Sequence, residues 1–364
     1  MRFPEAAQKE WKTAMLEELE SLQKWNVFEL TDLPKGHKYI GCRWVFDIKT
    51  DSQKRARLVA QGFSQVEGIH FNKLFSPVIR FESVKIVFAL AALHGWYMTG
   101  VDVCMAYLYS KLDEEIYMQQ PKGFIARGQE SKVIHLCRAL YGLKQAGLAW
   151  WKELSQSMKA LGFKHLNSYA RIFVCREGPN LILAVVYVDD AIFIGRNKNL
   201  VDKKKALFMA KWECQDLGDL KEFLQMHVTQ QGSEIKIDQT KYLKKVLERF
   251  SMVNAKSAVT PLPSNWDPKA NTGTATAAEV ANYQSIIRSL LYLMIGTRPD
   301  IAYAVTYLSQ FCTNPSPEHY KAALYICLYL LGTQDYSLVY SNTGDQGLEA
   351  YSASDWAANK IWHH

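Results

Sequence analysis

The sequence predicts a folded protein of mixed helices and strands, arranged in two or more domains. At 364 residues the chain is longer than one ordinary hydrophobic core supports. Its apolar content of 48% and aromatic content of 12% are typical of a globular protein and exclude a disordered one. Helical periodicity alternates with strand-like apolar runs along the chain, so both kinds of element are expected.

The first quarter of the chain is predicted to form a helix, a basic hairpin and a second helix. Apolar residues recur at three- and four-residue steps from Trp11 to Leu22, which predicts an amphipathic helix. Residues 39–63 contain two strand-like runs around a short polar turn. Helical spacing follows over residues 81–95, and Gly95 is a candidate C-cap.

The middle of the chain contains the most distinctive local pattern. Two apolar runs, at 181–186 and 191–195, flank the tetrapeptide YVDD at 187–190, which predicts a β-hairpin with a charged tip. Elements are also expected at 98–103 (strand), 115–118 (strand), 142–161 (helix), 199–211 (helix), 217–225 (a turn plus a short helix), 233–238 (strand) and 241–250 (helix).

The last third of the chain begins with a linker. Residues 260–281 contain three prolines and little periodicity. Two or three helices are expected between Tyr283 and about Leu331, and a last strand-like run covers 348–351.

Charge and cysteine content limit the functional class. The net charge is +7, and the segment from Lys35 to Lys85 contains ten Lys or Arg and four Asp or Glu residues. A basic segment favours a polyanionic partner, although a solvated surface is the alternative. The seven cysteines are widely spaced, without a CxxC pair or zinc-ligand spacing, which favours free thiols in a reducing compartment. With no signal-peptide pattern and no apolar run long enough for a membrane span, we expect an intracellular protein, in the cytoplasm or the nucleus, that is not secreted and has no membrane partner.

Three aspartates are the candidate catalytic residues. Asp189 and Asp190 are adjacent at the predicted hairpin tip, where two carboxylates repel each other unless a cation lies between them. Asp102 lies on another predicted strand. Carboxylates on neighbouring strands are the usual ligands of two magnesium ions about 3.5–4 Å apart in nucleotidyl transfer. For Asp189 and Asp190 alone, the alternative is an ordinary polar turn.

An ordered series of motifs makes the chain resemble a known family. The motifs are RLVAQGF (57–63), FSPV (75–78), VDV (101–103), EIYMQQP (115–121), LYGLKQA (140–146), YVDD (187–190), TPL (260–262) and TRPDIA (297–302). In this order they resemble the reverse transcriptase of copia-type retrotransposons, from about residue 10 to 355. One short motif alone is weak support, but the collinear set is specific.

The resemblance implies an α+β right-hand polymerase fold with fingers, palm and thumb, followed by a helical connection segment. It implies fingers and palm at 1–230, a thumb-like segment at 231–262, a linker and helical connection region at 263–345, and a truncated ribonuclease H start at 346–364. The implied activity is RNA-directed DNA polymerisation. The implied partners are an RNA or DNA template with its primer and deoxynucleoside triphosphates. The implied cofactor is two magnesium ions, with manganese as a substitute.

The resemblance also implies roles for individual residues. Asp102, Asp189 and Asp190 would bind the metals. Arg55 and Arg57 would hold the triphosphate, and backbone N–H groups from Val103 to Tyr107 would face it. The ring of Tyr107 would exclude a ribose 2′-hydroxyl. The remaining assignments are Gly142 and Lys144 beside the nascent pair, and Tyr187 and Lys54 near the primer and template. The alternatives are surface charge for the arginines, a core tyrosine for Tyr107 and a helix-start glycine for Gly142.

Several positions depart from the family pattern. The turn between Ile48 and Ala56 is short, Gln225 stands where glycine is usual, and Ala353 replaces the first ribonuclease H aspartate. We therefore expect no ribonuclease H activity. The alternative function is a degenerate, catalytically silent remnant that at most binds nucleic acid. An unrelated metal-dependent nuclease is a third hypothesis.

Overall fold

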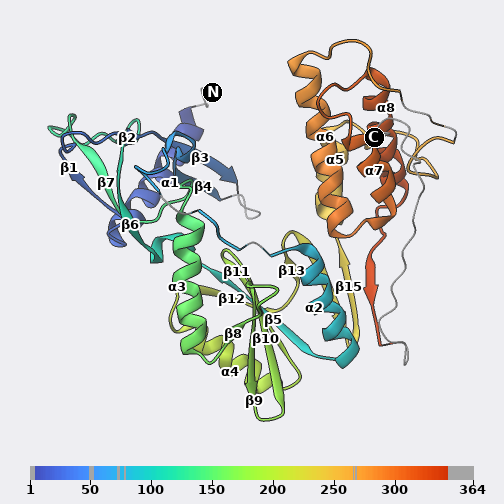
Figure 1. The fold of residues 1–364 in the computed structure, drawn as a ribbon, viewed down its shortest axis with the longest axis horizontal. Helices are drawn as coiled ribbons and strands as arrows, with labels where there is room; N and C mark the ends of the chain where they lie inside the picture. Colours follow the sequence, from blue (N-terminus) through green and yellow to red (C-terminus); the bar gives the residue numbers. More distant parts are fainter. Residues whose placement is uncertain are drawn as a thin grey trace. The chain divides into compact units, whose positions relative to one another are not determined.

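The computed structural model describes residues 5–48, 53–71, 74–77, 79–264, 266 and 269–342 (Figure 1). The chain forms two compact units. The first unit combines Met1–Ile79, Gly100–Phe193 and Lys198–Leu217; the second combines Arg80–Thr99, Ile194–Asn197 and Gly218–His364. None of the described helices is long and apolar enough to cross a membrane. The predicted ribonuclease H start, including the run at 348–351 and Ala353, lies outside the described residues.

A small sheet and a hairpin form the amino-terminal part of the first unit. Helix α1 packs on strand β4, and β4 forms with β3 the hairpin that the sequence predicted at 39–63. A four-stranded sheet with the order β1-β7-β6-β2 lies in the same unit. The bounds are α1 Glu5–Lys24, β1 Phe28–Thr31, β2 Tyr39–Ile40, β3 Cys42–Ile48, β4 Lys54–Ala60, β6 Lys111–Met118 and β7 Val133–Arg138.

A six-stranded sheet positions the candidate catalytic residues. Its strand order is β12-β5-β11-β10-β9-β8, so the strand of Asp102 (β5) is the neighbour of the strand that begins at Asp190 (β11). The apolar run Ala191–Ile194 of β11 is almost fully buried, which fixes this strand in the sheet interior. The bounds are β5 Tyr97–Val103, β8 Lys164–His165, β9 Ile172–Glu177, β10 Asn180–Tyr187, β11 Asp190–Gly195 and β12 Cys214–Asp219, with helices α3 Ala146–Ala160 and α4 Lys198–Met209.

The second unit contains a four-stranded sheet and a bundle of helices. The sheet order is β13-β14-β15-β16, and the helices α5 to α8 share one apolar core that includes Tyr283 and Leu290. Helix α2 ends at Gly95 with φ of +60°, the C-cap that the sequence predicted. The bounds are α2 Phe81–His94, β13 Glu222–Phe223, β14 Met226–Gln231, β15 Glu234–Asp238, α5 Thr240–Arg249, α6 Ala277–Gly296, α7 Ala302–Ser309, α8 Pro317–Gly332 and β16 Leu338–Tyr340.

The structure departs from the local predictions at 217–225 and at 338–340. The segment predicted as a turn plus a short helix at 217–225 forms the end of β12 and the strand β13. A tight turn joins β13 to β14, because Phe223 pairs with Met226 and only Leu224 and Gln225 lie between them. Strand β16 was not predicted, and it depends on pairing with β15, which is about a hundred residues earlier in the chain.

Candidate active site

The YVDD tetrapeptide forms the tip of a β-hairpin, as the sequence predicted. Strand β10 ends at Tyr187 and β11 begins at Asp190, so Val188 and Asp189 make the turn. Val188 has a φ of +53°, a left-handed conformation that is unfavourable for a β-branched residue. The surrounding structure must therefore hold this turn in place.

Two hydrogen bonds hold the turn. The indole N–H of Trp150, on α3, donates to the carbonyl oxygen of Val188 at 2.7 Å, and the Trp150 side chain is fully buried. The backbone N–H of Val103 donates to the carbonyl oxygen of Asp189 at 2.8 Å. The second bond joins the end of β5, next to Asp102, directly to the aspartate turn.

The three aspartates concentrate negative charge in a partly buried place. Burial, followed by the charges of Asp189 and Asp102, raises the pKa of Asp190 to about 7. Burial also raises the pKa of Asp189; the charge of Asp102 adds to this rise, while Arg57 and Arg55 oppose it. The three carboxylates therefore offer hard oxygen ligands, and the neighbouring arginines do not fully compensate their negative charge. That chemistry fits divalent magnesium or manganese.

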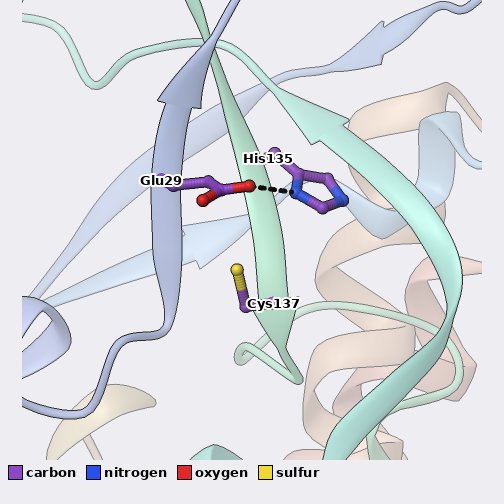
Figure 2. Close-up of side chains that lie close together, drawn as sticks. All are labelled: Glu29, His135 and Cys137. Carbon is purple, nitrogen blue, oxygen red and sulfur yellow. Dashed lines mark hydrogen bonds and ion pairs between the residues drawn. The ribbon is translucent and has the colours of Figure 1, made fainter.

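A close cluster of potential metal-ligating side chains lies apart from the aspartates in the sequence, within the same first unit. Over the described residues, one group of three Asp, Glu, His or Cys side chains has all its ligand atoms within 4.8 Å of one another, and that group is Glu29, His135 and Cys137 (Figure 2).

Aromatic and cationic side chains lie beside the carboxylates. Tyr107, in the short 3-10 helix Ala106–Tyr109 after β5, packs edge-on against Tyr141 at 4.9 Å between ring centroids. The guanidinium of Arg57 lies 5.4 Å from the centroid of the Tyr141 ring. Burial and the charge of Asp189 raise the pKa of both tyrosines, that of Tyr141 to about 12. The structure thus brings Arg57 and Tyr107 to the aspartates and adds Tyr141, to which sequence reasoning gave no role.

Two of the backbone donors expected to face a triphosphate are used inside the protein. The N–H of Val103 binds Asp189, as described above, and the N–H of Cys104 donates to the carbonyl oxygen of Glu213 at 2.8 Å. The expectation is therefore corrected for Val103. The segment from Met105 to Tyr107 holds the remaining backbone candidates.

Lys54 and Lys144 interact with other parts of the first unit. Lys54 forms an ion pair with Glu10 of α1, and its ammonium lies 5.4 Å from the centroid of the Trp11 ring. The ammonium of Lys144 donates to the carbonyl oxygen of Gln65 at 3.2 Å and lies 4.8 Å from the centroid of the Phe71 ring. Neither lysine is among the charges that shift the pKa of Asp189 or Asp190.

Gly142 is required by a close approach between two backbone segments. Its φ is +90°, and a Cβ atom there would lie 2.1 Å from the carbonyl oxygen of Ala60, the last residue of β4. The N–H of Ala60 donates to the carbonyl oxygen of Tyr141 at 2.8 Å. Helix α3 begins later, at Ala146, so Gly142 is not a helix-start residue.

Arg171 is a second residue that sequence reasoning missed. Its side chain is 5% exposed; Nε donates to the carbonyl oxygen of Pro77 at 2.6 Å and a terminal nitrogen donates to the hydroxyl of Ser76 at 2.9 Å. Burial lowers the pKa of Arg171 to about 10, and the charges of Tyr107 and Tyr187 oppose this shift. Tyr187 itself is 36% exposed at the end of β10. Arg171 thus links the FSPV segment to the aromatic residues of the site.

The chain is similar in sequence to known proteins along most of its length. Residues 25–264 match the family described as reverse transcriptase (RNA-dependent DNA polymerase). A retrovirus-related Pol polyprotein from transposon TNT 1-94 of Nicotiana tabacum is 37% identical over 359 residues, 95% of this chain and 27% of that protein. The corresponding polyprotein from transposon RE1 of Arabidopsis thaliana is 34% identical over 96% of this chain and 24% of that protein.

Two further matches are a relative covered over most of its own length and a solved structure. A putative transposon Ty5-1 protein of Saccharomyces cerevisiae is 31% identical over 72% of this chain and 86% of that protein. A solved foamy viral protease–reverse transcriptase in complex with double-stranded DNA aligns with 89% of this chain and 48% of that chain, at 13% identity and a TM-score of 0.45. The chain spans about a quarter of the length of the two plant polyproteins. The family match covers well over half of the chain, and the chain therefore belongs to the reverse transcriptase family, as its copia-type relatives do.

Proposed function

We propose that this chain is an RNA-directed DNA polymerase domain that adds deoxynucleotides to the 3′ end of a primer on an RNA or DNA template. One observation carries the proposal. The Asp102 strand and the Asp189–Asp190 turn are adjacent and hydrogen-bonded, and the charge of Asp102 contributes to the raised pKa of both Asp189 and Asp190. The proposal includes an intracellular site of action.

Asp102, Asp189 and Asp190 would hold two magnesium ions. When bound, these ions lower the pKa of the primer 3′-hydroxyl and neutralise charge on the triphosphate. The work of the protein is to fix the carboxylates. The Trp150 and Val103 hydrogen bonds do this, because they set the backbone on both sides of Asp189.

The neighbouring side chains would bind the incoming nucleotide. Arg55 and Arg57 lie close enough to lower the pKa of Asp189, and guanidinium groups suit phosphate oxygens. Tyr107 presents a partly buried ring against Tyr141, which is a rigid surface for a deoxyribose. A 2′-hydroxyl would meet that ring, so the proposed site favours deoxynucleotides.

The test is incorporation of labelled deoxynucleotide on a primed RNA template, with magnesium and then with manganese. Asp189→Asn should reduce extension by at least about 100-fold, the scale for loss of a group that acts in the transition state. Asp113→Asn is the matched control, because Asp113 is an exposed acid paired with Lys152. It should extend like the parent chain.

Three outcomes would contradict the proposal. Binding of the primer–template without any extension by the parent chain would support the silent-remnant alternative. Hydrolysis of the strand without nucleotide addition would support a nuclease. Equal extension by the parent chain and Asp189→Asn would show that Asp189 is not required for nucleotide addition.

A further inference from the structure

Three side chains of different donor type meet on the outer face of the β1-β7-β6-β2 sheet. Glu29 on β1 lies directly opposite His135 on β7 in the antiparallel register. Cys137 is two residues further along β7, and alternate residues of a strand face the same side. Ile134 and Leu136, on the other face of β7, are buried in the core, which keeps His135 and Cys137 on the outer face.

The atoms of these three side chains are close together. Nδ1 of His135 lies 3.1 Å from Oε1 of Glu29, and the ligand atoms of all three residues lie within 4.8 Å of one another. Figure 2 shows the carboxylate and the imidazole facing each other, with the Cys137 sulfur directed toward them. The ring of Tyr117, which pairs with His135 across β6 and β7, stacks on the imidazole at 5.1 Å and restricts its orientation.

We propose that Glu29, His135 and Cys137 bind one Zn²⁺ ion, separate from the aspartate site. Zinc accepts carboxylate oxygen, imidazole nitrogen and thiolate sulfur together, whereas magnesium requires oxygen ligands. Ligand atoms around a tetrahedral zinc ion lie roughly 3.3–3.8 Å apart. The distance between Nδ1 of His135 and Oε1 of Glu29, 3.1 Å, is just below that range, and the distances to the Cys137 sulfur are at most 4.8 Å. Three protein ligands leave the fourth position to water.

A simple surface ion pair is the competing explanation for Glu29 and His135. The Glu29 side chain is 67% exposed, and exposed pairs of this kind contribute little to stability. An ion pair, however, gives no role to Cys137, which is an exposed free thiol. The two explanations therefore differ in the role of Cys137, and Cys137 is the residue to substitute.

Cobalt titration of the reduced, full-length chain tests the proposal. Co²⁺ reports thiolate ligation through a near-ultraviolet charge-transfer band, and an excess of Mg²⁺ occupies oxygen-only sites without producing that band. We expect the band to saturate at one equivalent and to disappear when Zn²⁺ displaces the cobalt. Cys137→Ser should abolish it, and Glu29→Gln should weaken cobalt binding by at least about tenfold.

Cys312→Ser is the matched control, because Cys312 is a free cysteine of the second unit. Its cobalt band should equal that of the parent chain, and circular dichroism should show all the variants folded. The proposal is overturned if the parent chain gives no thiolate band, if Cys137→Ser retains it, or if Cys312→Ser loses it. Primer extension is not part of this readout, so failure here leaves the proposed polymerase function untouched.

Discussion

The buried indole of Trp150 is hydrogen-bonded to the carbonyl oxygen of Val188, the residue immediately before Asp189. This bond joins helix α3 to a turn that has unfavourable backbone geometry at Val188. The conformation of the aspartates thus depends on a residue that carries no charge.

Trp150→Phe should slow primer extension about tenfold, although it substitutes none of the aspartates. The substitution leaves the Val188 carbonyl without its donor, at a cost of about 1–3 kcal/mol. Steady-state kinetics should show the loss mainly in kcat, and thermal unfolding should measure the stability change. Trp151→Phe is the control, because Trp151 packs on Arg171 and Phe173. If both variants behave alike, the Val188 bond does not position the turn.

Arg57→Ala should raise the KM for deoxynucleotides about tenfold, which corresponds to about 1.4 kcal/mol of lost binding. Arg57 acts on the pKa of Asp189, whereas Lys54, on the same strand, is paired with Glu10. Lys54→Ala should therefore leave the KM nearly unchanged. An equal effect of both substitutions would indicate general surface charge rather than a specific phosphate contact.

Gln225→Gly should stabilise the second unit by about 1 kcal/mol. Leu224 and Gln225 have φ values of +51° and +57°, the conformation of a type I′ hairpin turn, which favours glycine. The hydroxyl of Tyr292 donates to the carbonyl oxygen of Leu224 at 2.7 Å and helps to hold this turn. Gln231→Gly, within β14, should instead destabilise it. Thermal unfolding of the two variants gives the comparison, and a lower Tm for Gln225→Gly would refute the strain argument.

Asp300→Asn should destabilise the second unit at neutral pH by about 3 kcal/mol, since it leaves the buried Arg298 guanidinium without its carboxylate. Burial opposes ionisation of Asp300, but the hydrogen bond and charge of Arg298 outweigh it and lower the pKa. A lowered carboxylate pKa means that this stabilisation is complete above the ordinary aspartate value of about 3.9 and is lost as the pH falls through the lower folded value.

Denaturant unfolding from pH 6 down to pH 3, roughly the range that spans the ordinary aspartate pKa, measures that dependence. The parent chain should lose stability at the acid end, and Asp300→Asn should show a smaller loss over the same range. Asp335→Asn, at an exposed position of the same unit, is the control. A parallel pH dependence in the parent chain and Asp300→Asn would show that the ion pair is not responsible.

Local sequence patterns predicted the elements that depend on neighbouring residues. The hairpin at Tyr187, the hairpin at 39–63 and the cap at Gly95 each follow from short-range periodicity and turn chemistry, and all three are present. Strand β16 depends on pairing with β15, which is distant in the sequence. Strand β13 depends on a turn in which Leu224 and Gln225 have positive φ, a conformation that these residue types disfavour. Periodicity within a short window contains no information on either.

The same distinction applies to the candidate site. Motif order identified the aspartates, Arg57 and Tyr107, and the structure places them together. The hydrogen bond of Trp150 joins residues 38 positions apart, and no local pattern in the sequence indicated it. The Glu10 partner of Lys54 lies similarly far away, on a different element. Side-chain partners of this kind emerge only from the tertiary fold.

The contact between Ala60 and Gly142 has a consequence for how the β3–β4 hairpin can move. Ala60, at the base of the hairpin, is hydrogen-bonded to Tyr141 and packs closely against Gly142. The ring of Tyr141 faces Arg57. Bending of the hairpin is therefore confined to the part beyond Ala60. Any side chain introduced at position 142 would force the two main chains apart. Arg57 would then move away from Asp189, although the substitution changes neither of these two residues.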